Sequence, residues 1–167
     1  MYNTEIHRNP MPELYMLCGI PTSGKSTYTK TNFGMQLNTD FVVLSTDNYL
    51  EAIAEQNKRT YNEVFDAFIG QATKRLEFDL ISATIAGKCI IWDQTNLSAK
   101  TRRKKLKKIP ETYSKTAIYF EIELEEALER NETREGKFIP KDILKRMYHQ
   151  FEIPTLEEGF DSIVKGK

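Results

Sequence analysis

Short apolar segments alternate with longer amphipathic segments along this chain. The apolar segments are typical of buried strands and lie at residues 14–18, 41–44, 89–92 and about 116–121. Between the second and the third of them, apolar residues recur at helical spacing from Tyr61 to Ala83. Strands that alternate with helices predict an α/β fold, built as a parallel sheet of four to five strands with helices on both faces.

The other helices are predicted from periodicity and from residues that favour helix ends. Thr46 or Asp47 is a candidate cap for a helix that runs to Gln56, and Pro140 suits the first turn of the last helix. A short fifth strand is expected near Ile163. The predicted helices lie at residues 24–34, 49–56, 61–86, 98–108, 125–133 and from 140 onward.

The composition is that of an ordinary globular domain, with 40% hydrophobic and 29% charged residues among 167. Lys plus Arg and Asp plus Glu both number 24, so net charge neither favours nor excludes a nucleic-acid partner. We expect a flexible arm at residues 1–12 and one domain over 13–167. No segment resembles a signal peptide or a membrane span, and Cys18 and Cys89 lie in apolar strands. We therefore expect reduced cysteines, a cytoplasmic setting and no membrane contact.

The segment from Gly19 to Ser26 matches the phosphate-binding P-loop pattern G-x-x-x-x-G-K-[ST]. It follows an apolar strand and opens a helix, the context that distinguishes this motif from a tight turn. Backbone N–H groups of such a loop surround a phosphate, Lys25 reaches the β- and γ-phosphates, and the Ser26 hydroxyl ligates Mg²⁺. ATP and Mg²⁺ are therefore the expected ligands. The residues expected to hold ATP are Gly19, Ile20, Pro21, Thr22, Ser23, Gly24, Lys25, Ser26 and Thr27.

Two aspartates follow predicted strands. Asp47 comes shortly after the second strand and can accept the proton of an attacking hydroxyl, although a helix cap is an alternative role. Asp93 ends the third strand and can hold Mg²⁺ together with Ser26, with plain capping as the alternative. Ligands of parallel sheets bind beyond the carboxyl ends of the strands, so the P-loop and both aspartates are expected to converge there.

Two stretches of positive charge are further candidates. Arg130 and Arg134 lie one helical turn apart and are expected to contact ATP from a helical lid, which Lys137 extends in a glycine-containing loop. Salt bridges to neighbouring glutamates are the alternative. Basic residues are also concentrated at positions 100–108. They either contact a nucleic-acid backbone or form a solvated helix face. They are Lys100, Arg102, Arg103, Lys104, Lys105, Lys107 and Lys108.

These stretches together resemble the 5′-hydroxyl polynucleotide kinases. The resemblance runs from about Leu14 to Ile163. Its most specific parts are the sequence DQTN at residues 93–96, the segment 130–140 and the tail QFEIPTLEEGF at 150–160. The resemblance implies that ATP binds with Mg²⁺, and that Lys25 and Ser26 are essential for phosphates and metal. It further implies that Asp47 is the general base on the 5′-hydroxyl and that Arg134 stabilises the transition state from the lid.

The chain departs from this family at the acceptor site and in its domains. Phage-type enzymes carry an arginine three residues after the base, where this chain has Leu50. Other residues must then bind the acceptor, and the candidates are Asn96, Arg102, Arg103, Lys58 and Arg59. The D-x-D motif of the phosphatase domain is missing, so we expect pairing with a separate phosphatase or ligase.

Three functions remain in competition. The first is an ATP-dependent kinase that phosphorylates a 5′-hydroxyl end of DNA or RNA, in nucleic-acid repair, with Lys25, Asp47 and Arg134 as catalytic residues. The second is a kinase for a small acceptor such as a nucleoside, a sugar or a nucleotide-sugar, which needs no basic face. The third is an ATP-binding protein that transfers nothing.

Overall fold

The computed structural model describes residues 11–34 and 41–167, which form one five-stranded sheet. The strand order is β2-β3-β1-β4-β5, and every neighbouring pair is parallel. The strands are β1 (Glu13–Cys18), β2 (Phe41–Leu44), β3 (Cys89–Asp93), β4 (Ser114–Tyr119) and β5 (Ser162–Lys165). The predicted α/β fold with a parallel sheet is confirmed, and so is the short last strand.

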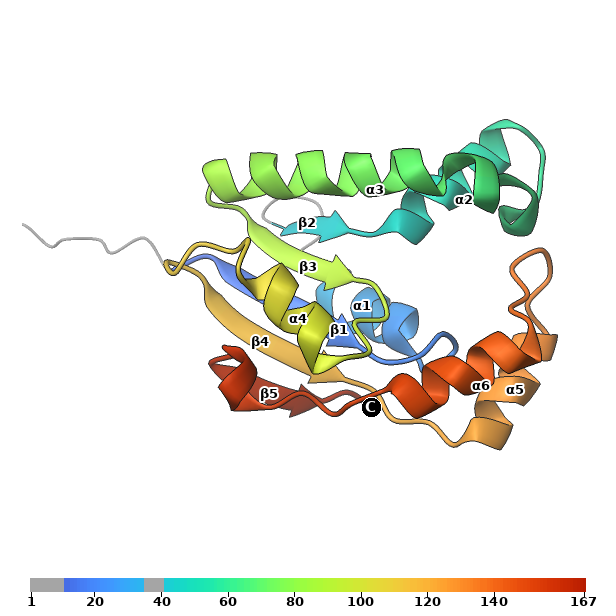
Figure 1. The fold of residues 1–167 in the computed structure, drawn as a ribbon. Helices are drawn as coiled ribbons and strands as arrows, with labels where there is room; N and C mark the ends of the chain where they lie inside the picture. Colours follow the sequence, from blue (N-terminus) through green and yellow to red (C-terminus); the bar gives the residue numbers. More distant parts are fainter. Residues whose placement is uncertain (1–10, 35–40) are drawn as a thin grey trace, which may run out of the picture.

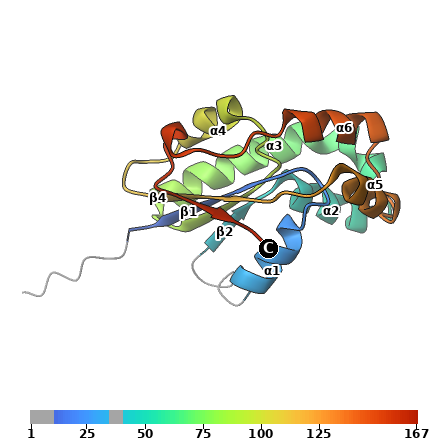
Figure 2. The same ribbon diagram turned by 90° about the horizontal axis from the view of Figure 1, so that it is seen from below.

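Helices cover both faces of the sheet. Figure 2 shows α1 on one face and α3 with α4 on the other. The helices α2, α5 and α6 lie toward the carboxyl ends of the strands (Figure 1). The helices of the described residues are α1 (Lys25–Phe33), α2 (Thr46–Gln56), α3 (Tyr61–Ile85), α4 (Ala99–Leu106), α5 (Leu124–Glu132) and α6 (Lys141–Gln150), with a 3-10 turn η1 (Leu156–Glu158).

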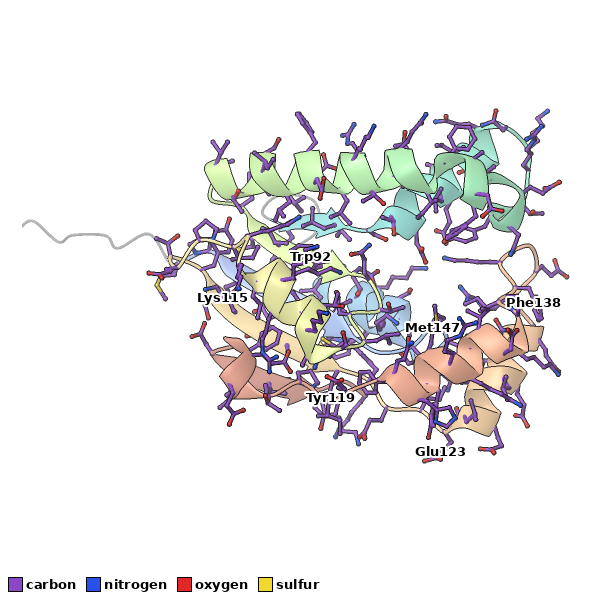
Figure 3. The ribbon with its side chains drawn as sticks, in the orientation of Figure 1. Trp92, Lys115, Tyr119, Glu123, Phe138 and Met147 are labelled. Atoms are coloured by element: carbon purple, nitrogen blue, oxygen red, sulfur yellow. The ribbon has the colours of Figure 1, made fainter. Side chains whose placement is uncertain are left out.

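Successive strand residues point to opposite faces and so enter two separate cores. Met16 and Trp92 pack beneath α3 with Leu80, in the core where Figure 3 labels Trp92. Leu17 and Ile91 pack on the other face, in the core that includes α1. Both faces are apolar, which is why the strands appear in the sequence as continuous apolar runs.

A third, smaller core joins the P-loop to α5 and α6, which we call the lid helices because they flank the expected lid. Ile20 of the P-loop packs with Ala127 of α5 and Leu144 of α6, and all three are almost completely buried. The two lid helices therefore rest directly on the loop that is expected to bind phosphate.

The beginning of α2 differs from the prediction. Ser45 is the cap, and its hydroxyl accepts a hydrogen bond of 3.2 Å from the Asn48 N–H. Thr46 and Asp47 instead lie in the first turn of the helix. Because Asp47 is not needed as a cap, its carboxylate is available for other contacts.

The expected arm at residues 1–12 lies almost entirely outside the described residues. Of its last two residues, Pro12 offers its carbonyl oxygen to the Ser114 N–H at 3.0 Å, at the edge of β4. Within residues 11–34 and 41–167, no helix has the length and apolar character needed to cross a membrane.

Candidate active site

The P-loop leaves β1 and turns sharply before α1 begins at Lys25. Thr22 and Gly24 adopt positive φ angles of 70° and 99°, which let the backbone curl. A Cβ on Gly19 would lie 2.8 Å from the Ser23 Oγ, so this first glycine is required for close packing. The Ser23 Oγ is itself buried without a hydrogen-bond partner. A loop of this shape with an unpaired hydroxyl fits a phosphate ligand.

The Lys25 side chain is folded back onto this loop. Its Nζ donates to the carbonyl oxygens of Gly19 and Ile20, at 2.7 Å each. Burial lowers the pKa of Lys25 to about 8, although the negative charges of Asp93 and Asp47 act in the opposite direction. The charges of Asp93, Asp47 and Arg134 all influence this amine, so the four side chains belong to one electrostatic site.

Asp47 faces this site from the first turn of α2, and both of its carboxylate oxygens have partners. Oδ1 accepts a hydrogen bond of 2.8 Å from the Tyr61 hydroxyl, and Oδ2 lies 2.9 Å from the Lys137 Nζ. Partial burial acts to raise the pKa of Asp47. The charge of Lys137, and hydrogen bonds from Lys137 and Tyr61, outweigh burial and hold this pKa below its ordinary value. Asp47 is therefore ionised at neutral pH.

Asp93 lies at the end of β3, paired in register with Leu17 of β1. Burial raises the pKa of this carboxyl above its ordinary value. Lys25 opposes the rise, and the negative charge of Asp47 adds to it. A half-buried carboxylate near a phosphate loop fits a Mg²⁺ ion, which commonly takes one or two protein ligands and completes its shell with water and phosphate. No larger group of potential metal ligands occurs in the described part of the chain. Asp93 and the exposed Ser26 are thus the residues that would hold Mg²⁺.

The two lid arginines have different surroundings. Arg130 donates from Nη1 to the Thr22 carbonyl oxygen at 3.0 Å, and its Nη2 pairs with Glu126 at 2.5 Å. It therefore touches the P-loop and also makes the salt bridge that was the alternative interpretation. The Arg134 Nη1 is buried without a hydrogen-bond partner. In the described residues, this nitrogen and the Ser23 Oγ are the two such buried side-chain atoms, and an anionic ligand would satisfy both.

The loop after α5 closes onto the opposite side of the site. Asn131 holds it at its base, with hydrogen bonds of 2.7 and 3.1 Å to the backbone of Ile139. At its tip, the carbonyl oxygens of Gly136 and Phe138 accept hydrogen bonds from Asn62 of α3 at 3.0 and 2.8 Å. Figure 3 labels Phe138 in this loop, on the side of the molecule where α3 begins. We call residues 133–140 the lid loop.

Two of the five candidates for binding the acceptor have structural roles instead. Asn96 is buried, and its amide donates to the Leu17 carbonyl oxygen at 2.7 Å. Arg102 is completely buried and pairs with Glu158 at 2.7 Å, so the expectation that it contacts a substrate is wrong. Arg103, the next residue on α4, is exposed. Lys58 and Arg59, the other two candidates, are exposed between α2 and α3.

Tyr61 and Glu51 were not foreseen as site residues. Tyr61 begins the apolar stripe of α3, and periodicity assigns such a stripe to core packing. Glu51 lies one helical turn after Asp47, and its carboxylate pairs with Lys137 at 2.5 Å. No local signal in the sequence connects either residue to the lid loop. The four-residue spacing of Asp47 and Glu51 indicates that they share one face of a helix, but not what that face contacts.

Comparisons with known proteins agree with the phosphate-binding geometry. A family model described as an AAA domain, AAA_33, matches residues 14–154. The L-seryl-tRNA(Sec) kinase of Methanococcus maripaludis is 28% identical over 152 residues, which are 89% of this chain and 56% of that protein. The chain therefore spans just over half the length of this curated relative.

Solved structures share the fold at lower identity. A candidate kinase from Chloroflexus aurantiacus superposes with a TM-score of 0.66 at 19% identity, covering 93% of this chain and 85% of that one. A chain of the Pnkp1/Rnl/Hen1 RNA repair complex gives 0.63 at 23% identity, covering 90% and 46%. A gluconokinase from Sinorhizobium meliloti gives 0.51 at 16%, covering 93% and 82%. At these identities the likeness is one of fold alone.

Proposed function

Because this chain belongs to the AAA domain family of P-loop kinases, we propose that it transfers the γ-phosphate of ATP to a 5′-hydroxyl end of DNA or RNA. The observation that carries the proposal is geometric: the Ser23 Oγ of the P-loop and the Arg134 Nη1 of the lid are buried without partners, and the lid loop also contacts the Asp47 carboxylate. A cation for the phosphates, a carboxylate for the acceptor and a lid arginine are what transfer to a hydroxyl requires.

The chain's own residues divide the reaction between them. Lys25 leaves the loop carbonyls to bind the β- and γ-phosphates, and Arg134 satisfies its unpaired nitrogen on the transferred group. Asp47 accepts the proton of the acceptor hydroxyl as its oxygen bonds to the γ-phosphorus. The bond from that phosphorus to the bridging oxygen breaks, and ADP leaves with the electron pair. Mg²⁺, held by Ser26 and Asp93, would supply charge neutralisation on the phosphates.

A polynucleotide acceptor is supported by four observations. The tail and the DQTN stretch resemble polynucleotide kinases, and one structural neighbour is a chain of an RNA repair complex. The curated relative is named for a kinase that acts on seryl-tRNA, also a hydroxyl carried by RNA. Exposed basic residues of α4 add positive charge for a nucleic-acid backbone: Lys100, Arg103 and Lys104, with Lys107 and Lys108 just beyond the helix.

A small acceptor is the second candidate, and specific observations favour it. Leu50 is completely buried at the position where phage-type polynucleotide kinases carry an arginine, and Arg102 pairs with Glu158. Both facts remove cations from the acceptor side. A nucleoside or sugar would need neither of them.

One acceptor assay separates these possibilities. The protein is incubated with γ-labelled ATP, Mg²⁺ and separate 5′-hydroxyl DNA, 5′-hydroxyl RNA, seryl-tRNA, nucleoside and sugar acceptors, each at several salt concentrations. We expect label on a 5′-hydroxyl end, with a rate at subsaturating acceptor that falls steeply as salt rises. Label on a nucleoside or sugar alone, with little response to salt, would favour the small acceptor.

The base is tested in the same assay with Asp47→Asn. We expect transfer to fall by about 10²-fold or more with ATP binding nearly unchanged, because the amide cannot accept the proton. Asp66→Asn, at an exposed position of α3, is the matched control and should transfer normally. Normal turnover by Asp47→Asn would overturn the assignment. ATP binding without label on any acceptor would overturn the kinase proposal itself.

A further inference from the structure

Lys137, at the tip of the lid loop, contacts residues of two helices, α2 and α3, around the proposed base. Its Nζ lies 2.9 Å from the Asp47 Oδ2 and 2.5 Å from the Glu51 Oε1, both on α2. The same ammonium lies 4.6 Å from the centre of the Tyr61 ring, at the start of α3. The lysine side chain is only 21% exposed, whereas the side chains of Asp47 and Glu51 are half exposed.

Tyr61 completes the arrangement from the other side. Its hydroxyl donates to the Asp47 Oδ1 at 2.8 Å, and the Lys137 ammonium lies over the face of its ring. The carboxylate is therefore held at both oxygens, by one neutral donor and one charged donor. Each carboxylate oxygen has a second lone pair, so a held oxygen can still accept a proton from a third group.

We propose that Tyr61 and Lys137 are positioning residues for the base, which fix the orientation of the Asp47 carboxylate and connect closure of the lid loop to proton acceptance. The inference rests on the proposed function, because it needs Asp47 to be the base. Tyr61 fixes one oxygen from a helix that packs on α2. Lys137 reaches the other oxygen only when the lid loop is closed, so the base is complete only in the closed form.

The lid loop is attached to α3 independently of Lys137. Asn62 holds the Gly136 and Phe138 carbonyl oxygens, on either side of the lysine. Tyr61 and Asn62 are neighbours in the first turn of α3. The same helix turn thus positions both the carboxylate and the loop that delivers the ammonium to it.

Several charged groups surround Asp47, and they decide what removal of Lys137 would do. Glu51 comes from α2, Lys137 and Arg134 from the lid side, Lys25 from α1 and Asp93 from β3. Lys137 is the cation that touches the carboxylate. Without it, the carboxylate loses the cation that it contacts, and burial, which acts to raise the pKa of Asp47, is opposed less strongly.

The test measures kcat/KM for the acceptor as a function of pH at saturating ATP. Wild type should keep its activity down to about pH 5, because the base stays ionised. Lys137→Met should lower kcat/KM at neutral pH by about tenfold or more, and should move the acidic limb up by about one pH unit. Lys137→Arg should restore most of both. Tyr61→Phe should move the limb in the same direction by less.

Two further variants make the test specific. Lys141→Met removes another lysine next to the lid loop, one whose ammonium pairs with Glu132 at 2.6 Å, and should leave the profile unchanged. In Glu51→Gln, Asp47 is the carboxylate that still pairs with Lys137. The acidic limb should therefore move to lower pH. Melting temperatures confirm that each variant is folded.

The outcomes distinguish this inference from the function on which it rests. An unchanged acidic limb in folded Lys137→Met, with Asp47→Asn inactive, would overturn the positioning role and leave the base in place. Normal turnover by Asp47→Asn would overturn both.

Discussion

Under the proposed function, Lys25 would exchange its hydrogen-bond partners when ATP binds. In the structure its ammonium is satisfied by two backbone carbonyl oxygens of the P-loop, which an incoming phosphate must replace. Burial makes the charged form less favourable, so part of the protein carries a neutral lysine near pH 8. A bound triphosphate stabilises the charged form.

We predict that ATP binding takes up a proton at about one pH unit above the Lys25 pKa of about 8, but hardly any about one unit below it. Raising the pH through this range should correspondingly weaken ATP binding. Calorimetric titrations in buffers of different ionisation enthalpy measure the uptake. Lys25→Arg is the control, because its guanidinium stays charged and should bind ATP without this uptake. Equal uptake at both pH values would contradict the prediction.

At the scale of elements, the site depends on a contact between the lid loop and the beginning of α3. Thr60 and Glu63 form a capping box there, with the Thr60 N–H donating to Glu63 at 2.7 Å. Gly136 of the lid loop passes so close that an added Cβ would lie 2.9 Å from the Thr60 Cβ. Helix cap and lid loop are thus fitted to each other.

We predict that Gly136→Ala lowers transfer by several-fold, because the methyl group would push the lid loop, and Lys137 with it, away from α2. The positive φ of 66° adds strain of about 1 kcal/mol. Gly87→Ala is the matched control. Its φ of 61° gives similar strain, but it has free space around it and precedes the amino end of β3. Gly136→Ala should therefore lower both kcat and the melting temperature, whereas Gly87→Ala should lower the melting temperature and leave kcat nearly unchanged. Equal loss of activity in both variants would contradict the prediction.

At the scale of the whole molecule, a buried ion pair ties the C-terminal segment to the sheet-covering helices. The Arg102 guanidinium pairs with Glu158 of η1 through two hydrogen bonds of 2.7 Å. It also donates to the carbonyl oxygens of Asn96 and Leu97, at the exit of β3. The pair joins residues 56 positions apart and stabilises the loop that follows Asp93.

We predict that Glu158→Gln lowers the free energy of unfolding by about 3–5 kcal/mol, since it leaves a buried guanidinium without its counter-charge. Replacing both partners, as Arg102→Met with Glu158→Leu, should recover part of the loss. Urea unfolding measures the change. Glu77→Gln, which breaks the exposed pair with Lys108, is the control and should cost less than about 1 kcal/mol. Similar losses for Glu158→Gln and Glu77→Gln would contradict the prediction.

Much of the fold was predictable because it depends on how apolar residues are spaced within each segment. Each strand of a sheet buried on both faces is a continuous apolar run, and α3 repeats its apolar residues at helical spacing. The P-loop was predictable for the same reason, since its conformation depends on residues that are adjacent in the chain. The convergence of Asp47 and Asp93 followed from the rule that parallel strands end at one edge.

The contacts of individual polar side chains were not predictable in this way. Arg102 stands among basic residues of the same type, and only packing turns it inward, one helical turn before the buried Leu106. Tyr61 and Lys137 are 76 positions apart, and the closure of the lid loop brings them together around Asp47.

The sequence alone determined the succession of strands and helices along the chain, the phosphate loop, and the edge of the sheet at which charged residues gather. These depend on spacing within a segment. Only the tertiary structure decided which charges are buried, which oxygens of Asp47 are held and which residues hold them. These depend on how helix faces meet, and a periodic pattern says which face is apolar without saying what it will touch.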